Sequence, residues 1–238
     1  MTLYERSEPA APVMGRLVIP VLHRYTQHWL SLWKTAVSRF LVPVGGRENL
    51  AIRYDGRGVS YETPEKGDVL MAYPSMAIAN EFLKRSGNPP CLTQMQLQKL
   101  VYIAHGWNLA INGEPLASDP VEAWKFGPVF PELYNHAKYF GSKPIGRLIV
   151  PTDSNGVAFF FDSSVPEAPY KAKVTPDEKA VIDRVWDRYG SYSAFKLSDL
   201  THKPNTPWFN AYFNSGESSP IENSDIQAHY EDLAANAA

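Results

Sequence analysis

TQMQLQKLVYIAHGW, the stretch at residues 93–107, sets the main helix of this 238-residue chain. Thr93 and Gln96 fit a capping box, in which Thr93 bonds forward to the backbone and Gln96 bonds back. The apolar residues that follow recur at helical spacing on one face: Leu97, Leu100, Val101, Ala104 and Trp107. Asn112-Gly113 then supplies the stop, because glycine readily takes the left-handed conformation that ends helices. The stretch therefore predicts a long amphipathic helix that ends at this glycine.

Start signals elsewhere predict further helices. They run from Ser75 to about Ser86, from Pro128 or Pro131 to Phe140, from the capping box at Thr175, from Ser193 to Thr201, from Thr206 and from Ser224. Val121 to Phe126 alternates as a strand does and is broken by Gly127-Pro128, while 148–150 and 157–161 could pair through a turn. We expect an α+β fold that is mainly α-helical, a compact helical domain with a small antiparallel β-sheet.

Charge divides the chain near Met71. Residues 1–70 hold 9 basic and 7 acidic residues, a net of +2, and the remainder nets −4. Within the first part, 21–41 has the pattern of an amphipathic helix and 50–61 that of a hairpin. We therefore divide the chain into an N-terminal extension, 1–70, and a main domain, 71–238. The extension is an added recognition domain, a structural extension packed on the domain, or an overlong start with Met71 as the natural initiator.

Composition limits the classes of function. The formal net charge of −2 excludes a generally basic protein that coats nucleic acid, and a single cysteine excludes an internal disulfide. The most apolar early run, 17–22, is far shorter than the roughly 20 residues that a membrane span needs. The chain starts with acidic rather than basic residues, which is atypical of a signal peptide. We expect a cytoplasmic protein with no membrane partner.

Motifs of catalysis are missing from the sequence. It contains no phosphate-binding loop, no His-Glu-x-x-His pair and no Gly-x-Ser-x-Gly elbow. Cys91 with His105 as base, and Glu132 with His136 on one helix face, are more simply explained as structural residues. We therefore expect no enzyme and no catalytic, cofactor-binding or metal-binding residues. The alternative is a hydrolase that uses His105, His136 or His202 as acid or base groups.

Basic residues in two parts of the chain suggest a second class of function, nucleic-acid binding. The stretch from Arg16 to Gly58 contains seven basic and two acidic residues. Lys99, Lys125 and His105 could also contact a nucleic-acid strand. A DNA-binding transcriptional regulator, acting on its own operon, is therefore the main alternative function, and its binding would weaken steeply with salt.

Large rings flank a rigid turn at residues 122–128, EAWKFGP. Tryptophan and other aromatic residues are typical anchors of protein interfaces. Trp124 and Phe126 therefore either contact a partner or fill the core.

Taken in order, several segments resemble one family. They are 71–82, MAYPSMAIANEF; 96–107, QLQKLVYIAHGW; 114–116, EPL; 122–129, EAWKFGPV; 200–202, LTH; and 206–208, TPW. Over about 73–233 the chain resembles the Panacea-domain family, which includes SocA-like antitoxins and phage-associated GepA-type proteins. The resemblance implies a non-enzymatic antitoxin that neutralises a separately encoded toxin protein by direct binding. It also suggests a protease as a further partner, since one relative is thought to act as an adaptor.

This resemblance implies a recognition face. We expect six residues to lie at this face or just beneath it: Lys99, Tyr102, His105, Trp124, Lys125 and Phe126. In the alternative, these signature residues maintain the fold and other surface positions choose the toxin. The identity of the toxin and the oligomeric state do not follow from the sequence.

Overall fold

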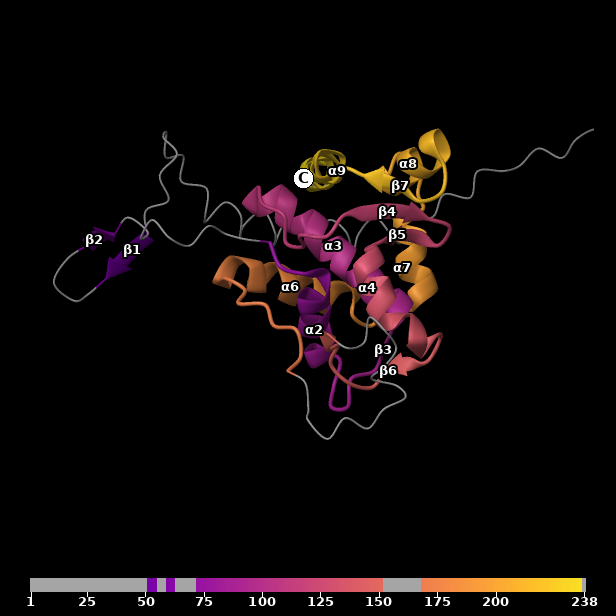
Figure 1. Ribbon diagram of the computed structural model, residues 1–238. Coiled ribbons are helices and arrows are strands. Elements are labelled where there is room, and N and C mark those ends of the chain that lie inside the picture. Colours follow the sequence, from indigo (N-terminus) through magenta and orange to yellow (C-terminus); the bar gives the residue numbers. More distant parts are fainter. Residues whose placement is uncertain (1–50, 55–58, 63–71, 152–167, 237–238) are drawn as a thin grey trace, which may run out of the picture. The chain divides into compact units, whose positions relative to one another are not determined.

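The computed structural model describes residues 51–54, 59–62, 72–151 and 168–236 (Figure 1). Helices dominate these ranges and the strands are short and antiparallel, so the predicted α+β class is confirmed. The helix expected at 21–41 and the strand expected at 157–161 lie outside the described residues. The boundary near Met71 stays a prediction. β1 (Ala51–Tyr54) and β2 (Val59–Glu62) pair as the predicted hairpin, with Ala51 opposite Glu62.

α3 (Gln94–Asn112) is the central helix (Figure 1). Its predicted capping box is present, and Gly113 ends it with a φ of 73°. The helix is more deeply buried than one apolar face requires, because all residues from 97 to 109 are buried. α2 (Ser75–Arg85), α6 (Pro176–Tyr189), α7 (Ala194–Thr201) and α9 (Asn223–Ala235) all pack against it. A helix covered on every side becomes the core of its domain.

The remaining helix starts follow local signals. Thr175 caps α6 through a complete capping box, Ser193 caps α7, and Thr206 caps α8 (Pro207–Ser215), all as predicted. Ser75 was wrongly predicted as a cap. The N-cap of α2 is Pro74, and the backbone N–H of Ser75 donates to Asp119 Oδ2 at 2.6 Å. A carboxylate distant in sequence therefore satisfies this helix end.

A three-stranded antiparallel sheet lies beside α3, in the order β5-β4-β7. The strands are β4 (Val121–Trp124), β5 (Gly127–Val129) and β7 (Ser219–Ile221). The prediction that Gly127-Pro128 ends the strand structure was wrong, because these residues begin β5. The following helix α4 (Pro131–Ala137) starts at the second of the two predicted prolines and continues into a 3-10 turn, η1 (Lys138–Phe140). β3 (Leu92–Thr93) and β6 (Pro144–Ile145) form a separate short pair.

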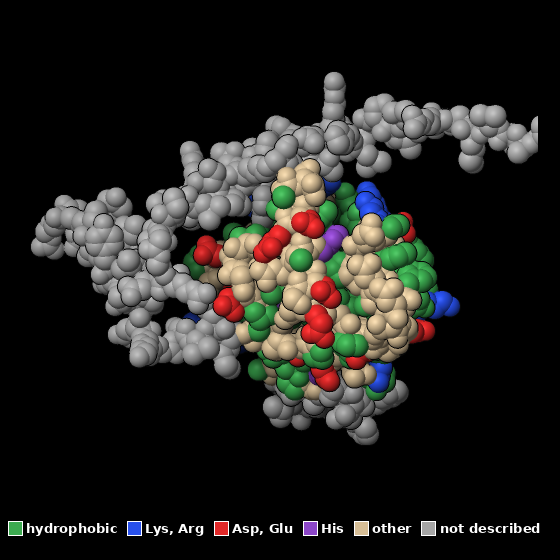
Figure 2. All heavy atoms as spheres, turned by 90° about the horizontal axis from the view of Figure 1, so that it is seen from above, with side chains coloured by type: hydrophobic (Ala, Val, Ile, Leu, Met, Phe, Trp, Pro, Cys, Tyr) green, Lys and Arg blue, Asp and Glu red, His purple; other side chains and the backbone are tan. Residues whose placement is uncertain are grey.

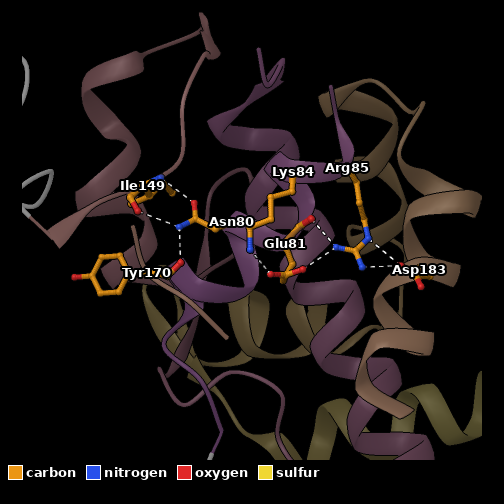
Figure 3. Close-up of polar contacts among 7 residues, drawn as sticks. All are labelled: Asn80, Glu81, Lys84, Arg85, Ile149, Tyr170 and Asp183. Atoms are coloured by element: carbon orange, nitrogen blue, oxygen red, sulfur yellow. Dashed lines mark hydrogen bonds and ion pairs between the residues drawn. The ribbon is translucent and has the colours of Figure 1, made fainter. Parts of the chain in front are cut away.

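Asn80 of α2 replaces a predicted strand pairing (Figure 3). Residues 148–150 form no strand; instead Ile149 N–H donates to Asn80 Oδ1 at 2.8 Å. Asn80 Nδ2 donates to Ile149 O at 3.0 Å and to Tyr170 O at 2.9 Å. One buried amide therefore holds the backbone at both Ile149 and Tyr170. On the same helix, Arg85 bridges Glu81 and Asp183 of α6.

Candidate functional site

The β4–β5 hairpin places two side chains at its tip. Because Trp124 pairs with Gly127, Lys125 and Phe126 form the turn, which we call the hairpin turn. Gly127 has a φ of 103°, a conformation that L side chains rarely adopt, and it closes the turn. Lys125 and Phe126 are exposed, with 62% of Phe126 accessible, and the Lys125 Nζ lies 5.7 Å from the centroid of the Phe126 ring.

Side chains of α7 and α8 hold the backbone of this turn. Three consecutive carbonyls face side chains of this pair of helices. Trp124 O accepts from Trp208 Nε1 at 2.8 Å and Phe126 O accepts from Ser198 Oγ at 2.9 Å. Lys125 O lies 3.4 Å from Nε2 of His202, whose Nδ1 lies 2.6 Å from Ser198 O. The His202 and Trp208 rings pack against each other at an interplanar angle of 46°, with centroids 3.8 Å apart, which joins the two helices. The backbone of the turn is therefore held by these two helices, while the Lys125 and Phe126 side chains stay exposed.

α3 holds the other edge of the hairpin. Lys99 Nζ donates to Pro128 O at 3.0 Å. Gln98 exchanges two hydrogen bonds with the backbone of Phe130, at 2.9 and 3.2 Å, as a neighbouring strand would. A Cβ at Gly127 would lie 2.7 Å from Lys99 Nζ, so the lysine needs this glycine. The free edge of β5 is thus closed by two polar side chains of a helix.

The three predicted residues on α3 are buried. Lys99 is 1% exposed, and burial lowers its pKa to about 7. Tyr102 packs its ring edge against Tyr230 of α9, and burial raises its pKa above the ordinary value. His105 Nδ1 accepts from Ala117 N–H, so Nε2 carries the proton of the neutral ring and donates to Asn223 Oδ1 at 2.9 Å. Burial lowers the pKa of His105 and keeps the ring neutral.

Trp124 has an exposure intermediate between those of the buried and the exposed residues of the predicted set. It is half-buried, its Nε1 donates to Glu122 Oε2 at 2.8 Å, and its ring packs edge-on against Tyr134. The structure therefore brings Trp124, Lys125 and Phe126 together on one hairpin. It places Lys99 directly beneath them, and Tyr102 and His105 further along α3 toward α9.

Two exposed rings that the sequence did not single out lie next to the hairpin turn. Phe195 is 77% exposed and precedes Ser198 by three residues on α7, so the two share a helix face. Phe213 of α8 is 63% exposed and contacts the Trp208 ring edge-on. Ser198 and Trp208 both bind the turn, so each of these two rings lies on a helix that holds it. We call Phe126, Phe195 and Phe213 the aromatic surface.

His136 and Cys91, which the sequence offered as candidates for chemistry, have structural partners. His136 Nδ1 lies 2.8 Å from the backbone O of Glu132, so the predicted contact of this pair does not involve the carboxylate. Cys91 is exposed and its Sγ lies 3.0 Å from Ser86 O. Both nitrogens of His105 are occupied by other groups. Within the described ranges, no three His, Cys, Asp or Glu residues are grouped as a metal site would require.

Comparisons with known proteins match part of the chain to a family and to a relative. Residues 97–209 match the family described as "Antitoxin SocA-like, Panacea domain". The chain is 32% identical to "Antitoxin SocA" of Caulobacter vibrioides (strain NA1000 / CB15N) over 138 residues, which are 56% of this chain and 66% of that protein. The chain thus spans slightly less than two thirds of this relative. No solved structure matches. Among the described residues, no helix is long and apolar enough to cross a membrane. The segment matched by the family contains most of α3, the hairpin turn, α7 and the start of α8, so this part of the chain is similar to the SocA-like Panacea-domain family.

Proposed function

We propose that the protein is an antitoxin that neutralises a cognate toxin protein by direct binding. The observation that carries the proposal is the aromatic surface, in which three phenylalanine rings are exposed, one on the hairpin turn and one on each of the two helices that hold this turn. Large exposed apolar groups in one place are typical of protein interfaces. The similarity to a protein named as an antitoxin supports a toxin as the class of partner.

Rigidity of the hairpin turn favours tight binding. A flexible loop loses conformational entropy when it binds, whereas a turn already fixed by hydrogen bonds loses little. Here the backbone carbonyls of Trp124 and Phe126 are held by side chains of α8 and α7. We propose that the Lys125 and Phe126 side chains contact the toxin directly.

The buried signature residues have a supporting role in this proposal. Lys99, Tyr102 and His105 are each at most 2% exposed, so a toxin cannot touch them without opening the domain. They hold β5, α9 and the loop at Ala117 in place. The predicted recognition set is thereby divided into contacting residues on the hairpin and residues that maintain the fold on α3.

The experiment begins with the full chain, tagged and expressed in its native host. A co-purifying protein is identified, expressed alone to test whether it stops growth, and then co-expressed with the full chain. We expect growth arrest by the partner alone and recovery on co-expression. A partner that does not inhibit growth, or recovery without any complex, would contradict neutralisation by binding.

Variants locate the contact. Phe126→Ser should abolish recovery and lower affinity at least about tenfold, since a buried aromatic anchor contributes about 2 kcal/mol or more. Ile111→Ser is the matched control, because Ile111 is also exposed, at 37%, but lies 12 residues along α3 from Lys99, or roughly 18 Å. A specific contact at the turn would be contradicted if both variants lost the same affinity. It would also be contradicted if Phe126→Ser alone had a lower melting temperature.

A further inference from the structure

We infer that the toxin meets this surface with an apolar patch flanked by carboxylates. The inference rests on the proposed function and adds the chemistry of the partner. Lysines accompany the rings of the aromatic surface: Lys125 adjoins Phe126 in the turn and Lys196 adjoins Phe195 on α7. Lys203 follows His202, which faces the turn. All three are exposed.

These ammonium groups are not neutralised by any carboxylate among the residues that the structure describes. In the described part of the chain, none of the three forms an ion pair. Lys125 and Lys196 instead lie over aromatic rings, with Nζ 5.7 Å from the Phe126 centroid and 3.6 Å from the Tyr192 centroid. The one acidic residue of α7 is Asp199. Cations beside exposed rings, without carboxylates of their own, suit a partner that brings the carboxylates.

The charge on the neighbouring face has the opposite sign. From Pro204 to the C-terminus the sequence holds no lysine or arginine and five acidic residues: Glu217, Glu222, Asp225, Glu231 and Asp232. Figure 2 shows acidic side chains along α9 and hydrophobic side chains gathered toward α8. An acidic toxin patch would be attracted to the lysines around the turn and repelled by α9. This asymmetry would orient the toxin on the domain.

Lys196→Glu tests the inference without disturbing the fold. Lys196 is the third residue of α7, and its backbone N–H already bonds to the N-cap Ser193. A glutamate at this position completes a capping box and is favoured near a helix N-terminus, so the variant should be at least as stable as the wild type. Lys125→Glu makes the same change of charge in the hairpin turn and tests whether a cation there contributes to binding. Lys143→Glu makes the same change of charge at an exposed position outside the surface.

The measurement is the affinity of each full-length variant for the growth-inhibiting protein that co-purifies, at low and high salt. We expect Lys196→Glu and Lys125→Glu each to weaken binding about tenfold at low salt and less at high salt, mostly through slower association. Lys143→Glu should change it by less than about twofold.

Each other outcome overturns the inference. If Phe126→Ser abolishes binding but the two lysine variants bind normally, toxin binding stands and the carboxylate patch is refuted. If the lysine variants bind more tightly, the toxin patch is basic. If the lysine variants lose affinity for a DNA duplex rather than for the toxin, the lysines bind nucleic acid. If they instead abolish self-association of the chain, a second copy occupies the surface.

Discussion

Lys99 gives the sharpest physical prediction, because its ammonium group is buried without a carboxylate. Its Nζ donates to Pro128 O, and no described residue forms an ion pair with it. Burial disfavours the charged form and lowers the pKa from 10.5 to about 7. The folded state therefore binds its proton more weakly than the unfolded state does.

The sign of the pH dependence follows from linkage. Between pH 7 and 10.5 the unfolded lysine is protonated and the folded one is mostly not, so the free energy of unfolding rises with pH. One pKa unit corresponds to about 1.4 kcal/mol, and the complete shift to about 5 kcal/mol. The destabilisation by Lys99 is full below about pH 7 and disappears above its unfolded pKa. Between pH 7 and pH 9 it should fall by about 2 kcal/mol.

Lys99→Met isolates this contribution, since methionine has a similar length and no charge. Denaturant unfolding of wild type and variant is measured at several pH values, and contributions of other titratable groups cancel in the difference. The lost hydrogen bond to Pro128 O subtracts about 1–3 kcal/mol at every pH. We expect the advantage of Lys99→Met to be greatest near pH 7 and to shrink by about 2 kcal/mol by pH 9. A difference independent of pH would refute the reasoning, because Lys99 would then have the same charge in both states.

Two further substitutions test the packing of the domain. A Cβ on Gly106 would lie 2.2 Å from the Tyr230 ring, so Gly106→Ala should lower stability by about 1–3 kcal/mol despite alanine's better helix propensity. Gly146→Ala, which meets nothing within 4 Å, is the control in the same thermal melts and should stay within about 0.5 kcal/mol. Asn80→Asp would place a carboxylate against two backbone carbonyls and should lower the free energy of unfolding by about 3 kcal/mol or more at pH 7, measured by denaturant titration. Stability should recover at acidic pH, because the carboxyl is then protonated. An unchanged denaturation midpoint would argue against these hydrogen bonds.

Helix boundaries could be predicted because their signals are local. The capping residues Thr93, Thr175 and Ser193 bond within three residues of themselves, and each was predicted correctly. Contacts across long sequence distances could not be predicted in this way. Asn80 reaches Ile149 across 69 residues, and the pairing of β4 with β7 joins Val121 to Ile221, 100 residues further along the chain. No short-range spacing encodes such contacts.

Only part of the candidate site could be predicted, because only some of its residues are marked by local sequence signals. The Gly-Pro dipeptide marks the turn, so the neighbourhood of Phe126 could be identified from sequence. The burial of Lys99 could not, because lysine is seldom buried and lies off the apolar face predicted for α3. Its face is covered by β5, an element that the sequence did not predict. Phe195 and Phe213 were missed because a phenylalanine in a helix is ordinarily assigned to the core.

The segments that carry the family resemblance meet at one place in the fold. Residues 96–107 supply Gln98 and Lys99, residues 122–129 form the hairpin, and residues 200–208 supply His202 and Trp208, and hydrogen bonds connect all three segments. The motif therefore describes the support of the hairpin turn. Phe195 and Phe213 of the aromatic surface lie outside the motif segments. Lys125 and Phe126, by contrast, lie inside a motif segment. Under the proposed function, substitutions of exposed residues on the turn, α7 and α8 should alter toxin binding directly, whereas substitutions beneath the turn should alter stability first and binding only as a consequence.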